Sequence, residues 1–255
     1  MTNTARGRLD GRVCLVTGAG NGIGRATALA MAAEGGHVLA LDVDAEAAKA
    51  TAELDHAIRP FVADVSRRDQ LAEAVAGLVA EHGRVDVLVN NAAVNLPGLF
   101  HEASQADIAR TVEVNILGAV HASQLVVPHM LARGSGAIVT ISSVNAMVAE
   151  PFLSIYAMSK AALVMLTRGM ALDYAGAGLR ANVICPGWVD TPFNHAHARL
   201  LGGLDAVYDS IESFQPIGRP GRPEEIASVA VFLASDEASL MTGSVVVADG
   251  GMTVQ

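Results

Sequence analysis

Three residues between positions 142 and 160 have the side chains and the spacing that proton transfer requires. Tyr156 and Lys160 are four residues apart, so in a helix they lie on one face, one turn apart. A nearby ammonium group favours the phenolate, which lowers the pKa of a tyrosine from its ordinary value of about 10. Ser143 ends a β-rich run and could donate a hydrogen bond to a substrate oxygen beside the phenol. Tyr-x-x-x-Lys also occurs by chance on many helices, so the acid–base role depends on the rest of the chain.

A glycine-rich turn near the N-terminus predicts a phosphate-binding site. The apolar run Val13–Thr17 indicates a buried strand, and it leads directly into GAGNGIG at positions 18–24 and then a helical pattern. Glycines let the backbone approach a pyrophosphate, and the helix N-terminus supplies amide hydrogens. The spacing fits T-G-x-x-x-G-x-G, through Gly18, Gly22 and Gly24, and does not fit G-x-G-x-x-G. The turn therefore predicts dinucleotide binding.

The second predicted strand, His37–Asp42, ends in an acid that bears on the choice of dinucleotide. A carboxylate there can hydrogen-bond both hydroxyls of an adenosine ribose, and it would repel a 2′-phosphate. Asn21 also stands at a loop position where a basic residue would help to hold a 2′-phosphate. Both observations favour NAD over NADP. Alternatively, Asp42 caps the following helix, although Asp44 is the better candidate for that cap.

Further polar residues follow the later strands. Asp64 could meet the adenine amino group from a strand end, or it could cap the next helix beside Ser66. Asn91 lies where a carboxyl-end loop begins, the place that ligands occupy in open α/β sheets, but a role in a turn is the alternative. Asn115 sits inside a predicted helix, where asparagine is unfavourable. It either hydrogen-bonds the backbone or anchors a water chain to Lys160.

The section from position 190 to 217 is the least regular part of the chain, since proline and glycine break it repeatedly. Its polar and aromatic residues suggest a lid over a substrate. His195 and His197 are predicted to be surface histidines, because no carboxylate or cysteine stands at metal-ligand spacing. A long helix predicted over Ile155–Tyr174 is apolar on more than one face, which suggests a subunit contact.

Composition limits the class of protein and its partners. With 255 residues and 51% hydrophobic content the chain can bury a large core, and its repeating pattern favours one domain over residues 1–255. The net charge of −9 argues against nucleic acid and anionic membranes as partners. No apolar run approaches the roughly 18–20 residues of a spanning helix, and the polar start lacks a signal peptide's apolar core. We expect a cytoplasmic protein in which Cys14 and Cys185 are buried thiols and not a disulfide.

Strands alternating with helices predict an α/β fold: a doubly wound, Rossmann-type, seven-stranded parallel sheet with helices on both faces. At this level the chain resembles the short-chain dehydrogenase/reductase family over nearly its full length. The motifs that carry the resemblance are Thr17-Gly18 with Gly22 and Gly24, Asp64, Asn90-Asn91-Ala92, Asn115, Ser143, Tyr156 with Lys160, Pro186-Gly187 with Thr191, and Asp249-Gly250-Gly251. One departure is Ala93, where the family usually has glycine, and its methyl group would tighten the nicotinamide side.

The resemblance implies an NAD-dependent oxidoreductase that moves a hydride between a secondary alcohol and the nicotinamide. Tyr156 would exchange a proton with the substrate oxygen, Ser143 would hold that oxygen, and Lys160 would bind the nicotinamide ribose. Asn115 would anchor a water relay to the lysine. Besides Tyr156 and Lys160, the implied cofactor contacts are Gly18, Asn21, Gly22, Ile23, Gly24, Asp42, Asp64, Val65, Asn91, Pro186, Gly187, Val189 and Thr191. Similar family members are commonly tetramers, so a homotetramer is expected.

The substrate itself is less defined. Ser143, Asn145, Tyr156 and Trp188 are the expected contacts, and Asn95, Glu150, Phe152 and Phe193 are also positioned to face it. This mixture is compatible with a sugar, a polyol, a cyclic alcohol or a hydroxy acid. The alternative enzyme is a 3-oxoacyl carrier-protein reductase, which usually prefers NADPH. A non-catalytic dinucleotide sensor is a remote alternative, because it would be expected to have lost a member of the Ser–Tyr–Lys set.

Overall fold

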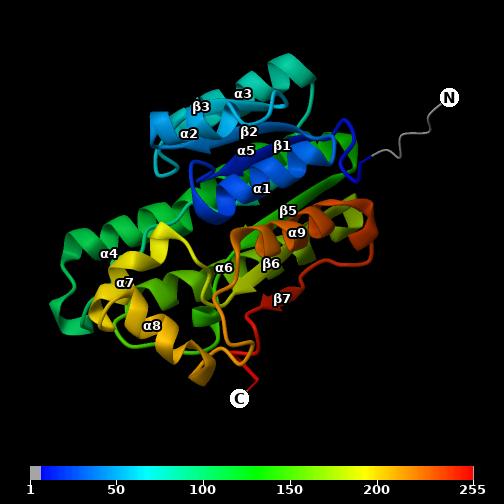
Figure 1. The fold of residues 1–255 in the computed structure, drawn as a ribbon. Helices are drawn as coiled ribbons and strands as arrows, with labels where there is room; N and C mark the ends of the chain where they lie inside the picture. The colour runs from blue at the N-terminus through cyan, green and yellow to red at the C-terminus, as the bar shows by residue number, and fades with distance from the viewer. Residues whose placement is uncertain (1–6, 255) are drawn as a thin grey trace.

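The computed structural model describes residues 7–254, which form a parallel sheet of seven strands in the order 3-2-1-4-5-6-7 (Figure 1). The strands are β1 (Val13–Thr17), β2 (His37–Asp42), β3 (Ile58–Val62), β4 (Val87–Asn90), β5 (Gly136–Ile141), β6 (Leu179–Pro186) and β7 (Val245–Ala248). β1 pairs with both β2 and β4, so the direction of the strand order reverses there. Ligands of open α/β sheets bind at the carboxyl ends of strands at such a reversal. The predicted fold class is confirmed.

Helices cover both faces of the sheet. Successive strand residues point to opposite sides, and because central strands such as β1 bury apolar residues on both sides, both faces need a covering layer. Cys14 and Val16 pack in one apolar core, and Val13 and Leu15 pack in the other. The first core is covered by α1 (Gly22–Ala33) and α9 (Pro223–Ala234), and the second by α3 (Arg68–His82), α5 (Gly118–Arg133) and α6 (Ser154–Tyr174). Both cysteines are buried and free, as predicted.

A continuous helical segment connects β4 to β5. It consists of α4 (Gln105–Thr111), a π-helical stretch (Val112–Leu117) and α5. Pro128 lies inside α5 and does not end it. By length and composition this 29-residue segment is apolar enough to cross a membrane, contrary to the sequence expectation, but half of its most apolar window is buried. A core helix passes the same test, so the finding is weak evidence for a membrane span.

The segment after β6 is more regular than predicted. It contains η5 (Pro192–Asn194), α7 (His195–Leu200), α8 (Leu204–Ser210) and η6 (Ile211–Ser213). Of these, α7, α8 and η6 share a small apolar core with Trp188, separate from the two cores of the sheet. Figure 1 shows α7 and α8 beyond the end of the sheet. The prolines and glycines that suggested irregular structure instead separate short helices. Residues 1–6, part of the polar start considered above, lie outside the described residues.

Candidate active site

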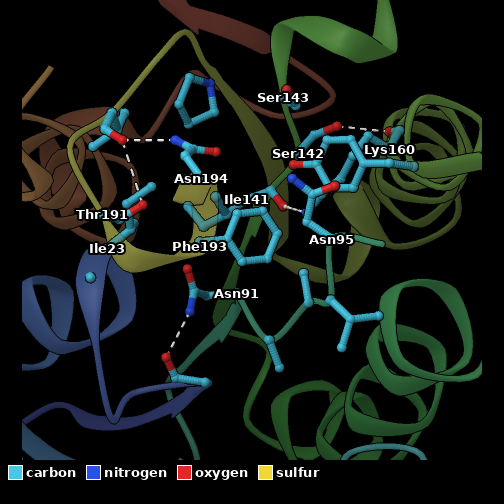
Figure 2. Close-up of a pocket in the computed structure, with 18 of the residues that line it drawn as sticks. Ile23, Asn91, Asn95, Ile141, Ser142, Ser143, Lys160, Thr191, Phe193 and Asn194 are labelled. Atoms are coloured by element: carbon cyan, nitrogen blue, oxygen red, sulfur yellow. Dashed lines mark hydrogen bonds between the residues drawn. The ribbon is translucent and has the colours of Figure 1, made fainter. Parts of the chain in front are cut away.

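A cavity of about 480 Å³ opens at the carboxyl ends of the strands, a volume typical of small-molecule sites (Figure 2). Most of the predicted site residues line it. They are Gly18, Asn21, Gly22, Ile23, Asp42, Asp64, Val65, Asn91, Ser143, Asn145, Tyr156, Lys160, Pro186, Gly187, Trp188, Val189 and Thr191. Three predicted residues, Gly24, Asn115 and Phe152, are not among the lining residues.

The glycine turn forms one wall of the cavity. Gly18 and Gly22 have φ angles of 64° and 51°, which a side chain would strain. Gly24 has a different reason to be glycine, because a Cβ there would lie 2.0 Å from the Gly18 carbonyl oxygen. Gly24 therefore lets α1 pack against the turn without itself reaching the cavity. The N-terminus of α1 opens at the cavity beside Ile23, where backbone amides suit a phosphate.

Asn91 holds this turn in place from the end of β4. Its Nδ2 donates to the carbonyl oxygens of Thr17 and Gly18 at 3.0 and 2.9 Å. Figure 2 marks one hydrogen bond of this side chain with a dashed line. The Thr17 hydroxyl in turn accepts a hydrogen bond from the Asn91 amide at 3.1 Å. The side-chain amide thus joins two strand ends, and its contact with a cofactor stays a prediction.

Asp42 faces the cavity at the end of β2. Its Oδ2 accepts from the Gly20 amide at 2.7 Å, and its Oδ1 accepts from the Asp44 amide at 3.0 Å. Asp44, and not Asp42, caps the helix α2 (Ala45–Ala52), where its side chain accepts from the amides of Glu46 and Ala47. The capping alternative for Asp42 is therefore wrong, and its carboxylate remains at the cavity wall.

Asp64 lies in the loop after β3, paired with a residue that the sequence did not indicate. Its Oδ2 receives a hydrogen bond from the Arg110 guanidinium at 3.0 Å, and its Oδ1 receives bonds from Ser66. Burial acts to raise the pKa of Asp64, but the bonds from Ser66 and Arg110 outweigh it and hold this pKa below its ordinary value. Arg67 occupies the N-cap position of α3, so Asp64 does not cap that helix.

Tyr156 and Lys160 lie on the same face of α6, as the spacing predicted, and both are buried. The Lys160 Nζ is 5.5 Å from the centroid of the Tyr156 ring and donates to the carbonyl oxygen of Ile141 at 3.0 Å. The Ser142 hydroxyl donates to the Lys160 carbonyl at 2.7 Å and fixes this turn of the helix (Figure 2). Burial lowers the pKa of Lys160 to about 8.

The phenol of Tyr156 differs from the sequence expectation. Burial raises its pKa, the Ser143 hydroxyl lowers it only in part, and the Glu150 carboxylate raises it further. The expectation that Lys160 lowers the pKa of Tyr156 is therefore wrong. The physical reason is that a buried phenolate loses its hydration, while the lysine directs its ammonium group to the Ile141 carbonyl.

Ser143 belongs to a chain of side-chain hydrogen bonds. Its hydroxyl donates to Asn145 Oδ1 at 3.1 Å, and Asn145 Nδ2 donates to Glu150 Oε2 at 2.8 Å. Ser143 also accepts from the Asn145 amide at 3.1 Å, as the N-cap of a short 3₁₀ turn. All three side chains line the cavity next to Tyr156.

Asn115 lies behind the cavity in the π-helical stretch, almost fully buried. Its Oδ1 accepts from the Val94 amide at 2.7 Å, and its Nδ2 donates to the Val94 carbonyl and to the Ser159 hydroxyl, both at 3.0 Å. Of the two alternatives for this side chain, the buried hydrogen bond to the backbone is correct. The amide ties the loop after β4 to the helix that carries Tyr156.

His197 is the residue on which the sequence prediction was most clearly wrong. It is 2% exposed, lines the cavity, places Nε2 3.0 Å from the Pro151 carbonyl oxygen and packs 5.9 Å from the Trp188 ring. His195, in contrast, is exposed as predicted. The buried pair His197 and Ala198 on α7 could have been found only by recognising that short helix.

Phe152 is not among the lining residues, whereas Phe193 lines the cavity 5.9 Å from the Tyr156 ring.

A doubly wound sheet with a glycine turn at its strand-order reversal, and a Ser–Tyr–Lys set in the same cavity, defines a nicotinamide-dependent oxidoreductase. Residues 18–253 match the protein family described as enoyl-(acyl carrier protein) reductase. With that match and its relatives, the chain belongs to the short-chain dehydrogenase/reductase family.

Several relatives cover nearly the whole chain. A 3-oxoacyl-[acyl-carrier-protein] reductase of Thermotoga maritima is 39% identical over 97% of this chain and 100% of its own length. A 2-keto-3-deoxy-L-fuconate dehydrogenase of Xanthomonas campestris is 41% identical over 97% of this chain and 82% of its own. Among solved structures, the ligand-free aldohexose dehydrogenase of Thermoplasma acidophilum superposes with a TM-score of 0.87 at 34% identity, covering 98% of this chain and 97% of that one.

Proposed function

We propose that this protein is an NAD-dependent dehydrogenase that transfers a hydride between a secondary alcohol and the nicotinamide. One observation carries the proposal: Ser143, Tyr156 and Lys160 line the same cavity as the glycine turn. A dinucleotide held by the turn would therefore present its far end to these three side chains. The relatives named as dehydrogenases act on hydroxyl-bearing compounds, which supports the same reaction class.

The residues present fit a dinucleotide. Gly18 and Gly22 keep the wall free of side chains, and the N-terminus of α1 offers amides to a pyrophosphate. Asp42 and Asp64 line the part of the cavity next to β2 and β3, where an adenosine would lie. Bound NAD supplies the hydride acceptor at the other end.

Proton transfer, substrate binding and positioning are assigned to different side chains near Tyr156. Tyr156 moves a proton between its phenol oxygen and the substrate oxygen. Ser143 would hold that oxygen by turning its one O–H donor from Asn145 Oδ1 to the substrate. Lys160 would bind the nicotinamide ribose from the next turn of α6. Asn115 acts as a positioning residue, because its side-chain amide is occupied by Val94 and Ser159. A water relay to the lysine would have to start from the backbone of the π-helical stretch.

NAD is the proposed coenzyme because of the charge next to β2. The Asp42 carboxylate lies against the glycine turn, 2.7 Å from the Gly20 amide, where a 2′-phosphate would meet a like charge. Arg110 also lines the cavity, but its guanidinium is paired with Asp64. Among the described residues that line the cavity, no other arginine is present to neutralise a phosphate there.

A 3-oxoacyl carrier-protein reductase is the second candidate, favoured by the Thermotoga maritima relative of that name. The net charge of −9 counts against docking of an acidic carrier protein. A dinucleotide sensor without turnover is disfavoured because the Ser–Tyr–Lys set is complete and shares one cavity.

The test is an absorbance screen of NAD and NADP reduction over sugars, polyols, cyclic alcohols and hydroxy acids, with 3-oxoacyl thioester reduction measured in parallel. We expect NAD reduction by at least one secondary alcohol at a higher kcat/KM than with NADP. Reduction of 3-oxoacyl thioesters with NADPH, and no alcohol oxidation with NAD, would favour the second candidate.

We also propose the wider setting that the sequence suggests: one catalytic domain, a lid at about 190–217 over the substrate, a homotetramer and a cytoplasmic location. Phe193 and His197 belong to the lid segment and line the cavity, which supports the lid. Met165 and Leu172 on α6 are 64% and 85% exposed, which supports a subunit contact through that helix. No nucleic-acid or membrane partner is proposed.

A further inference from the structure

Glu150 brings a carboxylate to the cavity next to Tyr156, Ser143 and Asn145. Its Oε2 accepts from Asn145 Nδ2 at 2.8 Å, so this oxygen is fixed. Its Oε1 accepts no hydrogen bond from the described residues, which leaves it available to a ligand. An ionised carboxylate only accepts hydrogen bonds, so a ligand group that meets it must donate.

Two further side chains that line the cavity have buried polar atoms without a partner within the described part of the chain. These atoms are the Trp188 Nε1 donor and the Asn95 Oδ1 acceptor. Trp188 is 6% exposed, and its ring packs against His197 and Phe214. Since buried unpaired polar atoms are unfavourable, a small rotation of either side chain that lets a ligand pair with its atom gains affinity. A hydroxyl both donates and accepts and can pair with either atom, whereas a carboxylate cannot donate to Asn95 Oδ1.

The charges around this end of the cavity also disfavour an anion. Of the cationic side chains that line the cavity in residues 7–254, Arg110 is paired with Asp64 near β3. Lys160 directs its ammonium group to the Ile141 carbonyl. His197 has Nε2 next to the Pro151 carbonyl. The charge of Glu150 reaches Tyr156, whose phenol pKa it raises, so it would also reach a substrate bound at that phenol.

We propose that Glu150 determines substrate specificity, and that the substrate is a neutral alcohol with more than one hydroxyl group, such as a polyol or sugar, and not a hydroxy acid. This inference rests on the proposed dehydrogenase function and deepens it. One hydroxyl is oxidised at Tyr156, and a second donates a hydrogen bond to Glu150 Oε1. A carboxylate in place of the second hydroxyl meets a like charge at Glu150 and cannot donate a hydrogen bond to its Oε1.

The experiment compares matched substrates that differ only in this group: cyclohexane-1,4-diol against 4-hydroxycyclohexanecarboxylate, and an aldohexose or polyol against the corresponding hydroxy acid. We expect the neutral member of each pair to have at least about a tenfold higher kcat/KM with NAD. Glu150→Gln keeps an oxygen that can accept from Asn145 and removes the charge, so the preference should fall about tenfold. Glu150→Arg should reverse it.

Glu73→Gln is the matched control, because it removes the same charge from an exposed position on α3 and should leave the preference unchanged. Thermal shifts of the protein–NADH complex with each pair give a second readout that needs no turnover, and the neutral member should stabilise the complex more. Faster turnover of the carboxylates by wild type, or an unchanged preference in Glu150→Gln, would overturn the role of Glu150 and leave the dehydrogenase function standing. NADH binding without oxidation of any alcohol would overturn the dehydrogenase function, and the inference with it.

Discussion

The ammonium group of Lys160 donates a hydrogen bond to the Ile141 carbonyl oxygen across 3.0 Å, from a side chain that is 3% exposed. The end of β5 is thus joined to the helix that carries Tyr156. One backbone carbonyl compensates only part of the hydration that a buried ammonium loses, which is why the pKa of Lys160 falls to about 8. The charge at the proposed catalytic centre is therefore held there at a cost in stability.

Lys160→Met should make the protein more stable at pH 7 while abolishing activity. Lowering a lysine pKa from 10.5 to about 8 corresponds to a cost of about 3 kcal/mol when the group is charged. We expect a gain of about 1–3 kcal/mol in the free energy of unfolding, measured by urea denaturation. A loss of stability at pH 7 would show that the Ile141 contact outweighs the cost of burial.

The same variant gives a pH dependence with a definite sign. Between about pH 8 and pH 10.5 the unfolded chain keeps the lysine proton that the folded chain has released, so wild-type stability rises with pH in that window. Below pH 8 the full cost of burial is present. The stability difference between Lys160→Met and wild type should therefore shrink as the pH rises from 8 to 10.5. A constant difference over this range would contradict the lowered pKa.

Tyr156→Phe should remove alcohol oxidation with little effect on nucleotide binding. The phenyl ring keeps the packing against Phe193, but it lacks the oxygen that exchanges the proton. Loss of a general acid–base group lowers kcat by about 10²- to 10⁴-fold. NADH affinity, measured by fluorescence titration, should change by no more than about fivefold, the effect of one hydrogen bond. Full activity in this variant would rule out the proton-transfer role.

Asp42→Ala should weaken the use of NAD and relieve the discrimination against NADP. Removing a carboxylate that bonds ribose hydroxyls is expected to lower kcat/KM with NAD about 10- to 100-fold. The ratio of activities with NAD and NADP measures the effect. Asp44→Ala is the matched control, because Asp44 caps α2 and its loss should cost about 1 kcal/mol of stability without changing the ratio. A preference for NADPH in wild type would contradict the role of Asp42.

Gly24→Ala should disrupt the nucleotide-binding turn, although Gly24 does not line the cavity. The added methyl would lie 2.0 Å from the Gly18 carbonyl oxygen, so either α1 or the turn must shift. We expect NADH binding to fall at least about tenfold. Gly77→Ala on α3 is the control, since a methyl there meets nothing within 4 Å and should stabilise the helix by about 0.5–1 kcal/mol. Normal NADH affinity in Gly24→Ala would show that the turn tolerates the shift.

Leu172→Glu should weaken the proposed tetramer. Leu172 is 85% exposed on α6, so a charge there costs the isolated subunit little, but it would be unfavourable at a subunit contact. Light scattering on wild type and variant measures the mass, and Leu240→Glu is a control outside α6 that is 98% exposed. An unchanged mass in Leu172→Glu would place the contact elsewhere.

The sequence determined the features that arise from local spacing. The four-residue spacing of Tyr156 and Lys160 predicted that they share one helix face. The spacing of the glycines predicted the nucleotide-binding turn, and the alternation of strands and helices predicted the parallel sheet. These features depend on residues that are close together in the sequence, so the sequence pattern is enough to predict them.

Only the tertiary structure decided which polar groups are paired and which are buried. Asn115 bonds a loop 21 residues away, and Arg110 neutralises Asp64 across 46 positions. His197 is buried because α7 packs on Trp188, and the Tyr156 pKa is raised because burial outweighs the hydrogen bond with Ser143. Hydrogen-bond partners and desolvation depend on segments that are distant in sequence, so they cannot be predicted from the spacing of residues along the chain.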